Sequence, residues 1–201
     1  MMILRSSPAS PFGRKVKIAM HHLGLADQIT VEKSDTTDPA DSIRSQNPLG
    51  KIPALILTDG TVIYDSPVIL EFLDALAGGG GILPRDGADR WRVLTLHALG
   101  DGIMDAALLQ VYEKRFRDEA THNERWLDLQ AGKITRGLTV LNAGPPEVAV
   151  NMGTIAIACA LGYLDLRFEG AWRKQYPALE AWLTGFAAAV PSFEKTAPPQ
   201  S

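Results

Sequence analysis

The sequence is poor in the features that mark secreted, membrane-spanning and nucleic-acid-binding proteins. Its 201 residues include one cysteine, Cys159, which excludes an intramolecular disulfide. No apolar run approaches the roughly 18 residues that cross a bilayer, and the first residues lack the apolar stretch of a secretory signal peptide. Lysine and arginine number 20 against 23 acidic residues, and the net charge of -3 gives no general attraction to phosphate backbones. We expect a cytoplasmic protein whose partners include neither a membrane nor a nucleic acid.

Histidine and cysteine, the usual ligands of zinc, are also sparse. The four histidines are His21, His22, His97 and His122, and their spacing matches no common metal-ligand pattern. The sequence therefore predicts no metal site. Cys159 lies within an apolar run, where we expect a small buried side chain rather than a nucleophile.

Residues 1–78 combine short apolar runs with helical patterns and predict an α/β domain of order βαβαββα. A serine followed by proline, at Ser10-Pro11 and again at Ser66-Pro67, supplies a helix cap and a proline suited to the first helical turn. Asp59-Gly60 separates two β-branched runs, which is a strong hairpin signal. The expected strands cover residues 2–5, 28–33, 54–57 and 61–64; the expected helices begin at residues 11 and 67, with a short one between 36 and 45.

Four consecutive glycines at 78–81 cannot sit in a regular element without a large entropic cost, so they predict a linker. Beyond them the pattern is helical throughout. The expected division is a domain at 1–78, a linker at 79–86 and an all-α domain at 87–201. The expected helices there cover residues 88–117, 123–141, 152–166 and 178–190, and residues 196–201 have the composition of a disordered end.

Three polar positions in the first domain are candidates for chemistry, and the first is Ser10. It stands at the mouth of the first helix, directly after the first strand. Its hydroxyl and the first free N–H groups of that helix point to one spot and favour an anion, such as a thiolate. The alternative is that Ser10 only caps the helix.

The second position is the segment of Lys51, Ile52 and Pro53, where a proline opens an apolar strand. If the peptide bond before Pro53 is cis, Ile52 offers its backbone to an extended ligand instead of to a strand. The alternative is an ordinary proline at the entry of a strand.

The third position is the pair Asp65 and Ser66, at a helix start that immediately follows a strand. Ser66 and the N-terminal amides of the helix suit a carboxylate, while Asp65 suits an ammonium group. Together they could hold the zwitterionic end of an amino-acid-like ligand. The alternative is a simple capping pair.

The motifs SPFGRK at 10–15, NPLGKIP at 47–53 and DSP at 65–67, followed by an all-α half with GDGIMDA at 100–106, resemble the glutathione S-transferase superfamily, and most of all its bacterial members. The resemblance covers essentially the whole chain. It implies the cytosolic glutathione S-transferase fold, in which a thioredoxin-like domain binds glutathione and a helical domain shapes a pocket for a second, apolar substrate. It also implies a homodimer.

The resemblance assigns roles to particular residues. Ser10 would stabilise the glutathione thiolate, Ile52 would bind the cysteinyl backbone, and Pro53 would be the cis-proline. Arg14 and Lys15 are expected to complement nearby carboxylates or the pocket rim. The glutathione-binding set is Phe12, Lys51, Ile52, Pro53, Asp65 and Ser66, with Lys51 beside the glycyl carboxylate and Asp65 and Ser66 at the γ-glutamyl end; Met104, Leu108 and Tyr112 are expected in the second-substrate pocket.

Two departures from the family pattern qualify this assignment. Many relatives begin with Cys-Pro-Phe, whereas this chain has Ser10 there and no CxxC, so disulfide exchange by its own thiol is disfavoured. The usual Ser/Thr-x-x-Asp cap reads Thr154-x-x-Ile157, and Asn151 is an alternative cap.

The function that the resemblance implies is a transferase that joins glutathione, as co-substrate, to a small hydrophobic electrophile. The alternatives are a non-enzymatic binding or regulatory protein with the same fold, and a glutathione-dependent reductase or dehalogenase.

Overall fold

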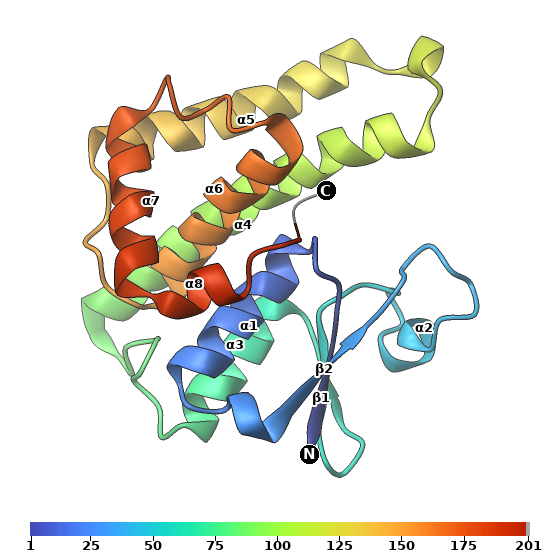
Figure 1. The fold of residues 1–201 in the computed structure, drawn as a ribbon, viewed down its shortest axis with the longest axis vertical. Coiled ribbons are helices and arrows are strands. Elements are labelled where there is room, and N and C mark those ends of the chain that lie inside the picture. Colours follow the sequence, from blue (N-terminus) through green and yellow to red (C-terminus); the bar gives the residue numbers. More distant parts are fainter. Residues whose placement is uncertain (200–201) are drawn as a thin grey trace.

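The structure, a computed structural model, describes residues 1–199 and has an α/β half followed by a helical half, which confirms the predicted fold class (Figure 1). The α/β half, here called the sheet half, consists of β1 (Met2–Ser6), α1 (Pro11–His22), β2 (Ile29–Lys33), α2 (Ile43–Gln46), β3 (Ala54–Ile56), β4 (Val62–Ile63) and α3 (Ser66–Leu76). The helical half consists of α4 (Gly87–Phe116), α5 (Glu124–Ala143), α6 (Met152–Phe168), α7 (Pro177–Ala189) and α8 (Pro191–Lys195). Short 3-10 turns lie at Ala26–Gln28 and Glu119–Thr121.

The four strands form one mixed sheet of order β2-β1-β3-β4. β1 is parallel to β2 and antiparallel to β3, so that Leu4 pairs with Val31 on one side and Leu55 on the other. The Asp59-Gly60 turn joins β3 to the antiparallel β4, as expected, with Gly60 at φ 87°. Figure 1 shows α1 and α3 on one side of these strands and α2 on the other.

Helix α1 contributes to two hydrophobic cores at once. Val16 and Met20 pack in the core beneath the sheet, whereas Ile18 and Ala19 pack in the core of the helical half. Because 3.6 residues make one turn, neighbouring positions face different directions, and one short helix can serve both cores. The start of α1 is thereby held at the junction of the two halves.

Helix α6 is the buried centre of the helical half. It packs so closely against α4 that a Cβ atom added to Gly100 of α4 would lie only 2.8 Å from Ala156 of α6. Asn151 caps its first turn by accepting from Thr154 N at 3.0 Å, and the Thr154 hydroxyl accepts from Asn151 N at 3.0 Å. This reciprocal capping box confirms Asn151 as the cap that replaces the missing aspartate.

The glycine segment after α3 is held by specific hydrogen bonds. The buried carboxylate of Asp74 accepts from Gly80 N at 2.8 Å and from Ile82 N at 2.7 Å. Ile82 and Leu83 are themselves buried in the helical core. The connection between the halves therefore has a defined conformation. The Asp74 carboxylate accepts the backbone hydrogen bonds that a helix or strand would otherwise accept from this segment.

Two features of the C-terminal region differ from expectation. Helix α8 was not predicted, because five residues are too few to show a helical period. Of the end predicted to be disordered, Thr196 is buried at 7% exposure, and residues 200–201 lie outside the described residues. Among residues 1–199, no helix has the length and apolarity needed to cross a membrane.

Candidate functional site

Ser10 occupies the N-cap of α1 and keeps its hydroxyl hydrogen available. Its Oγ accepts a hydrogen bond from Gly13 N at 3.1 Å. That bond uses a lone pair of the oxygen, so the O–H group can still donate to an anion. The two interpretations of Ser10 are therefore compatible. Capping fixes the oxygen, and the same hydroxyl, which is partly exposed, can contact a ligand.

Gly13 lies very close to the end of β1. A Cβ atom at Gly13 would lie 2.0 Å from Ser6 Oγ and 3.2 Å from Ser6 Cβ. A larger residue would force the Ser6 side chain to rotate and would crowd the first turn of α1, which carries Ser10, against the strand. This close contact with Ser6 explains the glycine in the motif SPFGRK, which the sequence alone does not explain.

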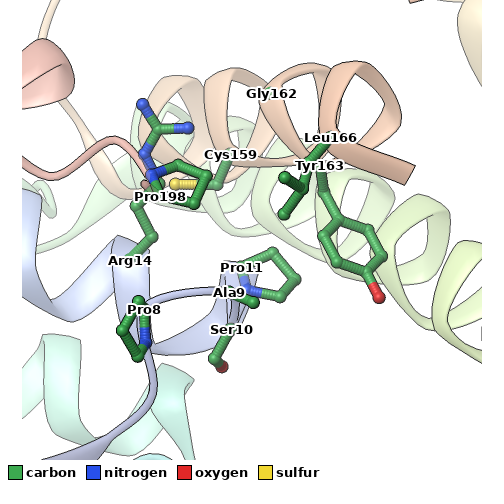
Figure 2. Close-up of a pocket in the computed structure, with 10 residues that line it drawn as sticks. All are labelled: Pro8, Ala9, Ser10, Pro11, Arg14, Cys159, Gly162, Tyr163, Leu166 and Pro198. Carbon is green, nitrogen blue, oxygen red and sulfur yellow. The ribbon is translucent and has the colours of Figure 1, made fainter. Parts of the chain in front are cut away.

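Figure 2 shows the residues that line a small cavity beside Ser10, between the start of α1 and helix α6. The cavity has a volume of about 10 Å³, room for about one water molecule. Its lining residues are Pro8, Ala9, Ser10, Pro11, Arg14, Cys159, Gly162, Tyr163, Leu166 and Pro198. An electrophile larger than water would need this space to be larger.

The segment before β3 has the cis-proline arrangement that would leave the Ile52 backbone available to a ligand. The Ile52–Pro53 peptide bond is cis, and β3 begins at Ala54, after Ile52. Buried Asn47 braces the turn, because its Nδ2 donates to Lys51 O at 2.9 Å and its Oδ1 accepts from Leu49 N at 3.0 Å. Asn47 opens the motif NPLGKIP, and its two hydrogen bonds hold the turn that precedes Ile52, a role that the motif alone does not indicate.

Asp65 and Ser66 lie at the start of α3, and their side chains differ in exposure. Ser66 is 1% exposed. Asp65 is exposed, and within the described residues its carboxylate makes no capping bond to α3, although it occupies the N-cap position. An exposed carboxylate that is not used as a cap is suited to a cationic group. The Lys51 side chain is likewise exposed.

The three residues expected in a second pocket do not share one environment. Met104 is 0% exposed and enclosed in the helical core, so its side chain supports the site from beneath. Leu108 and Tyr112 are partly exposed on the same helix. Tyr163, on α6, lines the Ser10 cavity instead, and burial raises the pKa of its phenol. The sequence contains no signal that distinguishes Tyr163 from the other aromatic residues of the helical half.

Comparisons with known proteins match both the sequence and the fold. The family model for the glutathione S-transferase N-terminal domain matches residues 9–76. The uncharacterized GST-like protein YibF of Escherichia coli (strain K12) is 36% identical over 206 residues, and the match covers 100% of both chains. The chain belongs to the glutathione S-transferase family.

Solved structures of the family support the same assignment. A glutathione transferase family member from Pseudomonas fluorescens, with bound glutathione, has a TM-score of 0.93 and 43% identity, and covers 100% of both chains. Another structure from that organism, with bound S-(propanoic acid)-glutathione, has a TM-score of 0.89 and 44% identity over 99% of this chain and 100% of that chain.

A buried charged cluster links the two halves of this family member behind the site. The Lys15 side chain on α1 is 0% exposed and forms an ion pair with Asp101 on α4. His97 Nε2 lies 3.2 Å from Lys15 Nζ. Burial lowers the pKa of Lys15 and raises that of Asp101, and the Asp65 charge acts against the lowering at Lys15. Lys15 thus complements a carboxylate, as expected, but one that is 86 residues away.

Within residues 1–199, no group of three or more His, Cys, Asp or Glu side chains is arranged to hold a metal ion. His97 instead lies beside two charged groups in a dry interior. Burial, followed by the positive charge of Lys15, lowers the pKa of His97 to about 3. The folded protein therefore keeps His97 neutral at and below neutral pH.

This pKa makes stability depend on pH. Between about pH 6.5 and pH 3 the unfolded chain protonates His97 and the folded chain does not, so the free energy of unfolding falls as the pH falls. From pH 7 to pH 5 we expect His97 to account for a loss of about 2 kcal/mol. Urea unfolding at both pH values should show a smaller pH dependence in His97→Gln, while His22→Gln, at an exposed site, retains the parent's dependence. An unchanged dependence in His97→Gln would contradict the assignment.

Proposed function

We propose that the protein binds glutathione and transfers its thiolate to a small apolar electrophile, with Ser10 donating a hydrogen bond to the sulfur. The observation that carries the proposal is the Ser10 hydroxyl at the N-terminus of α1, whose oxygen already accepts from Gly13 N and whose hydrogen remains available. The Pseudomonas fluorescens relatives support it, since one is described with glutathione and the other with glutathione substituted on sulfur.

Glutathione has charged groups at both ends and an extended backbone between them. In the proposed complex the exposed carboxylate of Asp65 and the hydroxyl of Ser66 hold the γ-glutamyl end. The backbone of Ile52, next to cis Pro53, pairs with the cysteinyl part, and Lys51 lies near the glycyl carboxylate. Phe12, half-buried and two residues after Ser10, borders the sulfur. Residues 1–78 thus bind glutathione, and the domain at 87–201 covers it.

The energy available at Ser10 is sufficient for thiolate formation. A thiol of pKa about 8.5 is a few per cent ionised at neutral pH, and lowering that pKa by about 2 units requires about 2.7 kcal/mol. One hydrogen bond to a charged group contributes about 1.5–3 kcal/mol, and a helix N-terminus adds about 0.3–1 kcal/mol. The thiol proton passes to solvent, and the sulfur forms a bond to the electrophilic carbon while the displaced group leaves with its electron pair.

The alternatives to this transfer are a glutathione-dependent reductase or dehalogenase and a non-enzymatic binding or regulatory protein with the same fold. A reductase would have to use the thiol of glutathione, because Cys159 is fully buried and burial raises its pKa to about 11. The small size of the cavity beside Ser10 favours the non-enzymatic protein as the second candidate. Binding without turnover would identify this second function. A cytoplasmic location, where glutathione is kept reduced, is part of either proposal.

The exposed face of α3 and α4 supports the further proposal of a homodimer. Arg90 Nη2 donates to Glu71 Oε2 at 2.9 Å, so the start of α4 lies against α3. Next to this pair, Trp91 is 67% exposed and Val68 is 50% exposed. Large apolar side chains exposed on adjoining helices are typical of an interface between subunits.

The glutathione site is tested first by the double variant Asp65→Asn, Ser66→Ala. Removal of one carboxylate charge and one hydroxyl should weaken glutathione binding by about tenfold or more, as measured by calorimetry. Asp27→Asn, which removes an exposed carboxylate in the same half, should bind as the parent does. If the parent shows no binding at several millimolar glutathione, the transferase proposal fails and a non-enzymatic protein that binds another partner is favoured.

The role of Ser10 is tested by Ser10→Ala, with Ser7→Ala in the adjoining loop as the control. Loss of the donated hydrogen bond should raise the pKa of the bound glutathione thiol by about 1–2 units and lower kcat/KM by about 10- to 100-fold. Ultraviolet absorbance of the thiolate in the complex, followed against pH, reports the pKa directly. An unshifted thiol pKa in Ser10→Ala would remove Ser10 from the reaction.

The dimer is tested by Trp91→Glu. Sedimentation should give about twice the 21.7 kDa chain mass for the parent and the chain mass for this variant, because a buried charge at an apolar interface is unfavourable. Trp126→Glu, on α5, changes an exposed tryptophan elsewhere and should leave the dimer intact. A monomeric parent would refute the dimer.

A further inference from the structure

Helix α6 brings a phenol group to the space beside Ser10. Tyr163 lines the same small cavity as Ser10. Figure 2 shows the hydroxyl groups of both residues pointing away from α6 and from Pro198. The side of Ser10 to which its hydroxyl points is thus also bordered by the ring of Tyr163.

Arg167 follows Tyr163 by one helical turn and lies on the same face of α6. Its guanidinium carbon lies 5.8 Å from the centre of the Tyr163 ring. The side chain is half-buried, and its Nε atom is buried without a hydrogen-bond partner among residues 1–199. Removing a cation from water is costly when the chain supplies no partner, and an anion beside the guanidinium would offset that cost.

A second arginine lies near the same phenol group, on α4. Leu108, Tyr112 and Arg115 recur at intervals of four and three residues and therefore share one face of that helix. The Arg115 guanidinium carbon lies 5.6 Å from the centre of the Tyr112 ring. Burial raises the pKa of Tyr163, and the positive charges of Arg167 and Arg115 act against that rise, which places both cations near its hydroxyl.

Two carboxylates that are close to these arginines in the sequence already have partners. Glu113 Oε2 lies 3.3 Å from Arg117 Nε, and Asp165 Oδ2 lies 2.7 Å from Arg173 Nη2. In the described part of the chain, the arginines that flank Tyr163 have no ion pair of their own. The arrangement therefore combines two aromatic rings with two positive charges that an anionic ligand can still bind.

We propose that Arg167 and Arg115 form an anion subsite that selects electrophiles carrying a carboxylate, with Arg167 as the principal specificity-determining residue. The inference rests on the proposed function, because it names the chemical class of the second substrate. A guanidinium presents its N–H groups as a fork that matches the two oxygens of a carboxylate. The apolar, reacting part of the electrophile then lies against the rings of Tyr112 and Tyr163.

The test compares two electrophiles that differ in one charge, 4-chloro-3-nitrobenzoate and 4-chloro-3-nitrobenzamide. In both reactions the glutathione thiolate forms a bond to the carbon that carries chlorine, and chloride leaves with the electron pair of the broken bond. We measure the ratio of kcat/KM for the benzoate to kcat/KM for the benzamide, divided by the same ratio without enzyme. This ratio should be about ten in the parent and should fall about tenfold in Arg167→Gln. A ratio near one in the parent, or an unchanged ratio in Arg167→Gln, overturns the subsite.

Two further variants separate a specific contact from a general effect of charge. Arg115→Gln should lower the same ratio by a smaller factor, and an unchanged ratio would refute the part assigned to Arg115. Lys114→Gln removes an exposed charge that points about 100° away from Arg115 on the helix, and it should retain the parent's ratio. The rate with the benzamide should be unchanged in all three variants. An equal loss with both electrophiles in Arg167→Gln would assign that arginine a structural role and overturn the subsite.

Calorimetry separates this proposal from the proposed function. Glutathione should bind Arg167→Gln as tightly as it binds the parent. Weaker glutathione binding in Arg167→Gln would mean that the arginine binds a carboxylate of glutathione itself, which overturns the subsite. If the parent does not bind glutathione, both proposals are refuted.

The two conjugates decide the subsite even if the parent binds glutathione and turns over neither electrophile. The parent should bind S-(4-carboxy-2-nitrophenyl)glutathione about tenfold more tightly than S-(4-carbamoyl-2-nitrophenyl)glutathione, and Arg167→Gln should bind both equally. That result supports the subsite while the transfer reaction fails. Equal binding of the two conjugates by the parent refutes the subsite and leaves the glutathione site in place.

Discussion

Helix α1 buries opposite faces in two cores, and this double burial determines where its N-terminus lies. Val16 packs beneath the sheet and Ile18 packs among the helices of the other half. The first turn also lies close against β1, where a Cβ atom at Gly13 would meet the Ser6 side chain. Ser10 therefore has a fixed position at the junction of the halves, and a hydroxyl held in this way loses little entropy when it binds an anion.

Two consecutive basic residues of α1 fix how the sheet half and the helical half are placed relative to each other. Arg14 reaches α8 and Lys15 reaches α4, because successive residues of a helix point about 100° apart. Burial of both cations is costly, and it is tolerated because each meets an acceptor: a carbonyl for Arg14 and a carboxylate for Lys15. The charges add little net stability, but an ion pair has far stricter geometry than an apolar contact. They select one arrangement of the halves.

Local patterns were sufficient to predict most elements from the sequence. Ser10-Pro11, Ser66-Pro67 and Asp59-Gly60 each carry their own signal, and the helices and turn they predict are present. Long-range partners have no such signal. Asp101 as the partner of Lys15, and the buried anchor of Thr196 on Arg14, depend on how separate elements pack. Met104 illustrates the same limit, because a helical period indicates an apolar face and does not distinguish its exposed edge from its centre.

The ion pair between Lys15 and Asp101 also bears on how such chains can recombine. The pair spans the connection at residues 79–86, so a crossover there between two related genes separates the lysine from its aspartate unless both parents encode them. A hybrid that inherits only the lysine has an uncompensated charge in a dry interior, at a cost of about 3–5 kcal/mol, a large part of the stability of an ordinary domain. Exchange of whole halves is thus restricted to parents that match at this one buried pair.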